Sequence, residues 1–208
     1  MTAQTCLLIG HDTLAVECGR MLLAAGHAIA AVATRHPLVA DWATRRGLAL
    51  VAPGAGLDAR LPDADWLFSI ANLEILPAAV LARARRGAVN FHDGPLPRYA
   101  GLNAPVWAIL NGETRHGVTW HLIEGGVDEG PILAQRLFEL APDETAASLN
   151  ARCFAAGIET FADVVRDLGH AVPVAQDLSQ RTLYLRDARP AGMGRIDWTA
   201  PATVGAAL

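Results

Sequence analysis

The chain has 208 residues, of which 52% are hydrophobic and 18% are charged, and its formal net charge is −4. This composition favours one α/β domain and excludes an intrinsically disordered chain. All 17 basic residues are arginine. The absence of lysine excludes a Schiff-base lysine and a P-loop lysine within the chain. The negative balance argues against a nucleic-acid surface, which needs clustered positive charge.

The cysteines and the N-terminal sequence indicate the cellular compartment in which we expect the protein. Cys6, Cys18 and Cys153 are odd in number and form no metal-like cluster, so we expect small buried side chains rather than disulfides or a metal site. The N-terminus has no signal-peptide pattern, and no uncharged run is long enough to span a bilayer. The sequence therefore predicts a soluble cytoplasmic protein with no membrane partner.

Apolar runs alternate with helical patterns, which predicts βαβ units and a Rossmann-like α/β fold, a mostly parallel sheet flanked by helices. Residues 53–61 are rich in Gly and Ala and are predicted to be a connection. Asp143 is the predicted N-cap of the longest helix. Strands are expected at residues 6–9, 27–34, 48–51, 66–70, 88–91, 117–123 and 132–140. Helices are expected at residues 14–25, 39–46, 77–84 and 145–168, with another through Trp107.

The composition changes beyond Gly169, where Pro173, Asp177 and Ser179 interrupt short runs. We therefore divide the chain into a catalytic domain at residues 1–170 and an extension at residues 171–208. The extension cannot bury a second core by itself, so we expect the chain to be a piece of a longer polypeptide.

Several common enzyme motifs are missing. The first predicted strand-to-helix turn, Gly10-His-Asp12, lacks the G-x-G-x-x-G spacing of nicotinamide-binding folds. The chain has no G-x-S-x-G nucleophile elbow and no H-E-x-x-H metal spacing. Dinucleotide, serine-hydrolase and metal chemistry are therefore disfavoured.

Asn90-Phe-His92 ends a predicted central strand. Side chains at alternate positions share a face, so Asn90 and His92 should project together at the carboxyl edge, where open α/β sheets bind ligands. An amide beside an imidazole can stabilise the oxygen of a carbonyl under attack. The alternative is structural, because an Asn often caps a strand end and a lone His is usually not catalytic.

A carboxylate is needed to orient the imidazole. Asp93 is adjacent and should face the opposite way. Asp128, in the Gly-rich turn Gly126-Val-Asp-Glu-Gly130, could reach the sheet edge, but the pattern alone leaves this open.

The order of these motifs resembles the 10-formyltetrahydrofolate-dependent formyltransferases over most of the chain, from the first strand to about Gly169. The motifs that carry the resemblance are Ile75-Leu-Pro77, Asn90-Phe-His92, Leu96-Pro-Arg-Tyr-Ala-Gly101, Gly117-Val-Thr-Trp-His121 and Gly126-Val-Asp-Glu-Gly130. The resemblance implies 10-formyltetrahydrofolate as co-substrate and a primary amine as acceptor.

By resemblance, the catalytic residues are Asn90, His92 and Asp128. Asn90 and protonated His92 would stabilise the oxyanion, and Asp128 would support the charge of His92 and help to move the proton. The resemblance implies no metal. The folate pocket would be lined by Ile75, Leu76, Leu96, Ile123 and Val127, and the substrate-supporting residues would be His121 and Arg98.

The residues after His92 bear on the identity of the acceptor. Gly94-Pro-Leu-Pro97 replaces the Ser-Leu-Leu-Pro run of the methionyl-tRNA enzymes. The sequence of residues 91–101, with Trp107, resembles the formylation domains of nonribosomal peptide synthetases. This resemblance implies that the acceptor is an aminoacyl group on a carrier domain and that carrier and adenylation domains are partners. Residues 195–198 resemble the start of the family's small C-terminal domain. The alternatives are a sugar-nucleotide amine formyltransferase, a 10-formyltetrahydrofolate hydrolase and a non-enzymatic folate-binding module.

Overall fold

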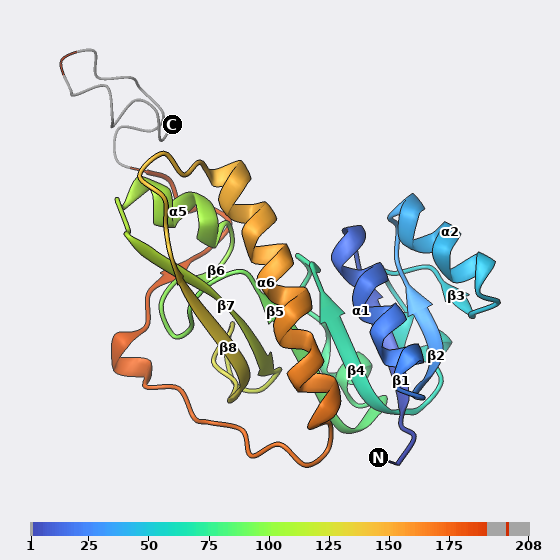
Figure 1. Cartoon of the computed structure of the whole chain (residues 1–208). Helices are drawn as coiled ribbons and strands as arrows, with labels where there is room; N and C mark the ends of the chain where they lie inside the picture. The colour runs from blue at the N-terminus through green and yellow to red at the C-terminus, as the bar shows by residue number, and fades with distance from the viewer. Residues whose placement is uncertain (1, 191–198, 200–208) are drawn as a thin grey trace.

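The computed structural model describes residues 2–190 and 199, and its centre is a seven-stranded sheet (Figure 1). The first five strands in spatial order are parallel, and the last two are antiparallel to their neighbours. The predicted α/β fold with a mostly parallel sheet is therefore confirmed. In spatial order the strands are β3 (Leu50–Val51), β2 (Ala28–Ala33), β1 (Thr5–Gly10), β4 (Ala64–Ile70), β5 (Ala84–His92), β7 (Arg115–Leu122) and β8 (Ile132–Glu139).

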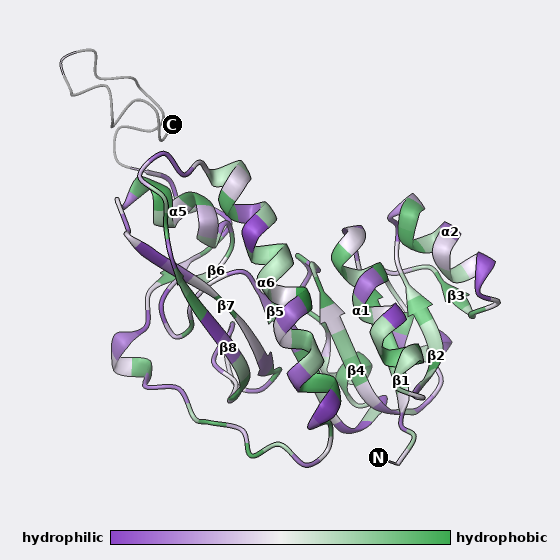
Figure 2. Ribbon diagram, viewed as in Figure 1, coloured by the Kyte–Doolittle hydropathy of each residue, from purple (hydrophilic) through white to green (hydrophobic). Residues whose placement is uncertain are grey.

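Helices cover both faces of this sheet. The larger of two apolar cores includes residues from α1 (Asp12–Ala24), α2 (Pro37–Arg45), α5 (Ala104–Leu110) and α6 (Ala146–Arg166). The smaller core, on the other face, includes residues from the short helices α3 (Leu57–Arg60) and α4 (Ala78–Leu81). In Figure 2 the parallel strands β1 and β2 are mostly hydrophobic, as expected for strands buried on both faces.

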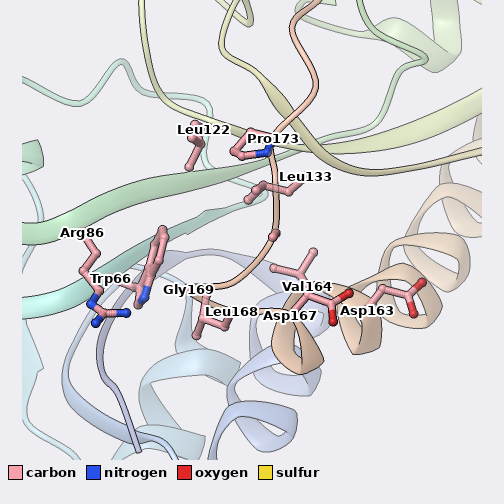
Figure 3. Close-up of a pocket in the computed structure, with 11 residues that line it drawn as sticks. Trp66, Arg86, Leu122, Leu133, Asp163, Val164, Asp167, Leu168, Gly169 and Pro173 are labelled. Atoms are coloured by element: carbon pink, nitrogen blue, oxygen red, sulfur yellow. The ribbon is translucent and has the colours of Figure 1, made fainter. Parts of the chain in front are cut away.

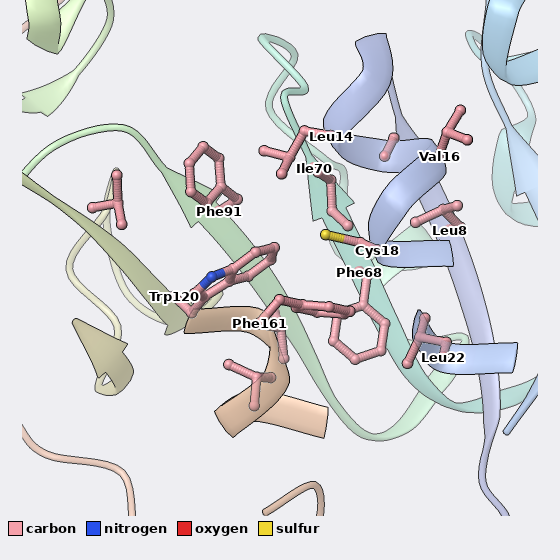
Figure 4. Packing of buried hydrophobic residues seen from close by; sticks show 14 of the residues in the cluster. Leu8, Leu14, Val16, Cys18, Leu22, Phe68, Ile70, Phe91, Trp120 and Phe161 are labelled. Atoms are coloured by element: carbon pink, nitrogen blue, oxygen red, sulfur yellow. The ribbon is translucent and has the colours of Figure 1, made fainter. Parts of the chain in front are cut away.

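Aromatic side chains join α6 to the middle of the sheet (Figure 4). The ring centroid of Phe161 on α6 lies 5.4 Å from that of Phe68 and 4.7 Å from that of Trp120. Trp120 in turn lies 5.0 Å from Phe91, and its indole N–H donates to the hydroxyl of Thr160 at 3.1 Å. These contacts fix β5 and β7 from the α6 side.

The N-cap of α6 differs from the prediction. Thr145, not Asp143, caps the helix: its hydroxyl accepts from the Ser148 amide at 3.1 Å, and the Ser148 hydroxyl accepts from the Thr145 amide at 2.9 Å. This reciprocal capping box satisfies two amide donors at the start of the helix. Asp143 lies two residues too early to reach them.

Other boundaries also differ from the predictions. Residues 57–60 form α3 inside the stretch expected to be a connection, because buried Leu57 packs into the smaller core. The helix expected at residues 77–84 is limited to α4, and β5 already begins at Ala84. A second, two-stranded sheet pairs β6 (Ala100–Gly101) with β9 (Leu183–Tyr184).

Residues 171–185, which we call the strap, leave the end of α6 and pass the β8 edge (Figure 1). Val174 forms an antiparallel bridge with Ile132, and η1 (Leu178–Gln180) leads to β9. The division of the chain near residue 170 stays a prediction, and residues 195–198 lie outside the described residues. Within the described part of the chain, no helix is long and apolar enough to cross a membrane.

The capping box gives a stability prediction. Replacing Thr145→Ala removes the cap and should lower the melting temperature by about 2–4 °C, which corresponds to about 1 kcal/mol for a chain of this size. Asp143→Ala is the matched control, because exposed Asp143 does not cap the helix. Thermal unfolding followed by circular dichroism measures both variants, and a larger effect of Asp143→Ala would restore the original assignment.

Candidate active site

The carboxyl end of β5 and the paired end of β7 place the polar side chains. In this antiparallel pair Asn90 lies opposite His121, and His92 lies opposite Thr119. Phe91 and Trp120, the intervening residues, belong to the core on the α6 face. Because side chains alternate along a strand, the four polar residues share the opposite face of the sheet.

Asn90 and His121 are in direct contact. The Asn90 amide nitrogen lies 3.2 Å from Nε2 of His121, and Nδ1 of His121 donates to the Leu122 carbonyl at 2.8 Å. A neutral His121 ring therefore accepts at Nε2 from Asn90, whereas a cationic ring donates there to Asp128, whose Oδ1 lies 3.4 Å away. Asn90 and Asp128 therefore both approach this one ring nitrogen.

His92 is 5% exposed and is held at both ring nitrogens. Its Nε2 donates to the Tyr99 carbonyl at 2.7 Å, which directs Nδ1 toward Oδ2 of Asp128 at 3.5 Å. Oδ1 of Asp93 also lies 4.0 Å from Nδ1. The expectation that Asp93 faces away was wrong, because β5 ends at His92 and strand alternation does not extend to the next residue.

Asp128 completes the cluster from the turn between β7 and β8. Its backbone is left-handed, with φ 56°, and its side chain is 12% exposed. Oδ2 accepts from the Gly101 amide at 2.7 Å. The turn therefore folds back over the sheet face, and the carboxylate lies between His92 and His121.

The electrostatic surroundings keep the Asp128 carboxyl ionised. Burial alone acts to raise its pKa. The hydrogen bond from His121, the positive charge of His92, the Gly101 amide and the charge of His121 together outweigh burial and lower the pKa from 3.8 to about 2. At neutral pH Asp128 is therefore a carboxylate that stabilises positive charge on the histidines and is itself a weak base.

The loop after His92 is anchored to β7 and β8. The Leu96 amide donates to the Thr119 hydroxyl at 3.2 Å, and this hydroxyl donates to the Gly94 carbonyl at 2.8 Å. Gln135 on β8 donates to the Leu96 carbonyl at 2.8 Å and to Thr119 at 3.0 Å. These bonds make the loop a fixed wall beside His92.

The five predicted folate-contacting residues lie in different environments. Ile75 is 83% exposed, on the segment that follows β4, and Leu76 packs against the smaller core. Leu96 is 3% exposed, so its side chain offers almost no free surface. Ile123 is half-buried against the smaller core, and Val127 is half-buried in the turn that carries Asp128.

Arg98, predicted to support substrate, belongs to a separate cluster. Its guanidinium donates to Glu113 and lies 5.3 Å from the ring centroid of Tyr99. The Tyr99 hydroxyl also donates to Glu113, at 2.6 Å. Arg98 therefore braces the loop that holds His92, and the structure does not bring it to Asp128.

A pocket of about 370 Å³ lies elsewhere, on the α6 face of the sheet (Figure 3). It is lined by Trp66 and Arg86, by Asp163 and Val164 at the end of α6, and by Asp167 and Leu168 just after the helix. Asn90, His92, His121 and Asp128 are not among its lining residues, and the sheet separates the two places. The polar side chains of β5, β7 and the Asp128 turn converge away from this pocket, and their cluster is the candidate active site.

The cysteines do not contribute to the site. All three are free and buried, and burial is the main cause that raises the pKa of the Cys6 thiol to about 12 and those of Cys18 and Cys153 as well. A buried thiol with a raised pKa is a poor nucleophile. Among the residues that the structure describes, no group of three or more His, Cys, Asp or Glu side chains could hold a metal ion.

Together, the fold and the site define an α/β enzyme with polar side chains at the carboxyl edge of a mostly parallel sheet. The family described as formyl transferase matches residues 58–165. The methionyl-tRNA formyltransferase of Anaeromyxobacter dehalogenans strain 2CP-C is 36% identical over 216 residues, which cover 93% of this chain and 68% of the relative. That of Trichlorobacter lovleyi is 40% identical over 140 residues, or 66% of this chain and 44% of the relative.

Solved structures agree in fold. The N-formyltransferase from Helicobacter canadensis, in complex with folinic acid and dTDP-3-aminofucose, gives a TM-score of 0.79 at 19% identity, covering 99% of this chain and 79% of that one. HypX from Aquifex aeolicus, in complex with tetrahydrofolic acid, gives a TM-score of 0.75 at 17% identity. This match covers 99% of the present chain and 34% of HypX. This chain belongs to the 10-formyltetrahydrofolate-dependent formyltransferase family, and it is a formyltransferase.

The sequence did not indicate several residues that build the site. The Tyr99 carbonyl and the Gly101 amide act through the backbone, so their side-chain identities carry no signal. Thr119 could have been found, because it alternates with His121 on one predicted strand. Gln176, which contacts the Asp128 turn from the strap, lies 46 residues from Gly130 and has no local signature.

The lowered pKa of Asp128 predicts a pH-dependent stability. A carboxylate whose pKa falls from 3.8 to about 2 on folding stabilises the fold above about pH 4 and loses this contribution as the pH falls toward 2. Asp128→Asn should therefore be less stable than the wild type at pH 6 by about 2 kcal/mol, with the gap closing between pH 4 and pH 2.

Urea unfolding at several pH values measures this gap. Asp143→Asn, which neutralises an exposed carboxylate, is the control and should follow the wild type. A difference for Asp128→Asn that stays constant from pH 6 to pH 2 would contradict the electrostatic explanation.

Proposed function

We propose that this formyltransferase uses Asn90, His92 and Asp128 to transfer a formyl group from 10-formyltetrahydrofolate to the amine of an aminoacyl group. The observation that carries the proposal is the convergence of the three side chains, from β5 and from the β7–β8 turn, on one sheet face. Family membership supports the reaction and the co-substrate. The identity of each catalytic residue and of the acceptor is the proposed part.

The proposed chemistry is direct acyl transfer. The neutral amine attacks the formyl carbon, a C–N bond forms, and the formyl oxygen becomes an oxyanion. The Asn90 amide has two N–H donors, one of which donates to the oxyanion. The cationic imidazole of His92 stabilises the same charge from the next position on this face.

Asp128 acts by charge rather than by taking the proton. With a pKa of about 2 it holds a proton poorly at neutral pH, so it orients His92 and balances its positive charge. The proton leaves the attacking amine and reaches the folate nitrogen as the C–N bond to folate breaks, through the Nδ1 edge of His92 or through water. No covalent intermediate is required.

The surroundings of Asn90 suit a planar ring. Ser69 on β4 lies beside Asn90 in register, and the segment that follows carries exposed Leu73 (69%) and Ile75 (83%). These two exposed apolar side chains offer surface that an aromatic ring could cover. We therefore place the folate ring between this segment and the turn that carries Ile123 and Val127.

Two observations support an aminoacyl group as the acceptor. Relatives at 35–40% identity are methionyl-tRNA formyltransferases, named for an acceptor with an aminoacyl group. The resemblance of residues 91–101 to formylation domains of nonribosomal peptide synthetases favours an aminoacyl group on a carrier domain as acceptor, with an adenylation domain as neighbour. The tRNA relatives weigh against the sequence-based exclusion of a nucleic-acid partner. Free buried cysteines support the cytoplasm as the compartment.

A sugar amine is the second candidate acceptor. The structural neighbour from Helicobacter canadensis was solved with dTDP-3-aminofucose, and another, WlaRD, is a sugar 3N-formyl transferase. Both are about 20% identical to this chain, so they support the fold more than the acceptor. Hydrolysis to formate is a further alternative, with water in place of the amine.

Removing a catalytic side chain should lower turnover strongly without loss of the fold. His92→Ala should lower kcat by about 10²–10⁴-fold because the charge next to the oxyanion is lost. Asn90→Ala should lower it by about 10²–10³-fold through the loss of one oxyanion donor. The control His170→Ala replaces an exposed histidine and should leave kcat unchanged. Tetrahydrofolate release measures turnover, and full activity of His92→Ala would refute the assignment.

An acceptor panel tests the function itself. The protein is incubated with 10-formyltetrahydrofolate and free amino acids, amino-sugar nucleotides, methionyl-tRNA or aminoacyl carrier proteins, and the mass of each acceptor is measured. We expect a gain of one formyl group on an aminoacyl acceptor, which His92→Ala loses. Formylation of only the sugar nucleotide would replace the proposed acceptor. Formate release in the absence of any acceptor would instead show a hydrolase.

A further inference from the structure

The turn that carries Asp128 is built from residues with great backbone freedom. Gly125 (φ 70°) and Gly126 precede Asp128, Gly130 follows it, and Asp128 itself has a φ of 56°. A non-glycine residue in the left-handed region costs free energy unless its surroundings hold it there. The position of the carboxylate therefore depends on contacts from outside the turn.

The strap supplies such contacts. The Gln176 side-chain amide donates to the Asp128 carbonyl at 2.8 Å and to the Gly130 carbonyl at 2.6 Å. Arg181 donates to the Val127 carbonyl at 2.8 Å and lies 3.4 Å from the Glu129 carboxylate. Three carbonyl acceptors of the turn, at residues 127, 128 and 130, are thus held by two strap side chains.

The same strap also holds the loop on the other side of the site. The Thr182 hydroxyl accepts from the Tyr99 amide at 2.7 Å, and the Tyr184 carbonyl accepts from the Leu102 amide at 2.8 Å. This loop provides the Tyr99 carbonyl that binds His92 and the Gly101 amide that binds Asp128. Residues 176–184 therefore connect both partners of the His92–Asp128 pair.

We propose that Gln176 is a positioning residue: its side-chain amide sets the Asp128 carboxylate against His92 by fixing the backbone of the turn. The inference rests on the proposed role of Asp128 and deepens it. Arg181 supports the same turn from the neighbouring carbonyl. Gln176 and Arg181 thus act on the site through the backbone of the turn.

The first test is a double-mutant cycle with Asp128. Gln176→Leu removes both donors at similar volume and should lower kcat by about 10–100-fold with little change in the KM for folate, because the geometry of the reacting groups loosens. In an Asp128→Asn background the same change should have little further effect, since the two residues act as a unit. Equal fold-losses in both backgrounds would overturn the proposal.

Gln180→Leu is the matched control, because Gln180 is an exposed glutamine on the same strap. It should retain the wild-type kcat, and melting temperatures check that all variants fold. If Gln176→Leu does not fold, Gln176→Glu tests the same contact. It keeps the shape but places an acceptor opposite two carbonyl oxygens.

Amide hydrogen exchange tests the positioning without relying on activity. Gln176→Leu should speed exchange at residues 126–130 by about tenfold relative to the wild type, as expected for the loss of two ordinary hydrogen bonds, while β1 stays unchanged. Unchanged exchange in the turn would overturn the proposal. A wild type with no turnover, combined with faster turn exchange in the variant, would refute the proposed function and leave the positioning role standing.

Discussion

The antiparallel pairing of β5 with β7 is the constraint on which the site depends. In a fully parallel sheet the next strand would leave in the same direction as β5. Because β7 runs the other way, its register sets Asn90 opposite His121 and His92 opposite Thr119. The turn that follows β7 can then fold back over the same face, which brings Asp128 between the two imidazoles. One change of strand direction therefore assembles side chains that are far apart in the sequence.

The apolar face of the same two strands provides the rigidity. Phe91 and Trp120 alternate with the polar residues of the site and pack against α6, where Gly157 allows a close approach: a Cβ at this position would lie 2.6 Å from the Phe91 ring. The indole N–H of Trp120 is satisfied by Thr160, so the buried polar atom carries no cost. Small displacements of α6 would therefore be transmitted to the backbone of Asn90 and His92.

The sequence predicted the features that depend on the periodicity of strands and helices, and it missed those that depend on the backbone geometry of turns and helix ends. Strand alternation placed Asn90 and His92 on one face, and the helical pattern at residues 145–168 predicted the helix that the structure shows as α6. Asp128 has a left-handed backbone in a turn, where no period applies, so only resemblance indicated its role. The cap was misassigned to Asp143 because both Asp and Thr suit an N-cap, and only the Ser148 partner decides between them. The strap contacts of Gln176 are long-range and leave no local pattern.

The electrostatics of the site require this long-range support. A buried carboxylate stays ionised only while its partners remain in place, and Asp128 has partners from three separate segments: His92 on β5, His121 on β7 and the Gly101 amide of β6. Loss of any one weakens the balance between burial and attraction that lowers its pKa. Since β6 and the turn are both bonded to the strap, the charge of Asp128 and the position of residues 176–184 are linked. The negative charge of Asp128, which balances the positive charge of His92, therefore depends on the strands, the turn and the strap together, and not on the turn alone.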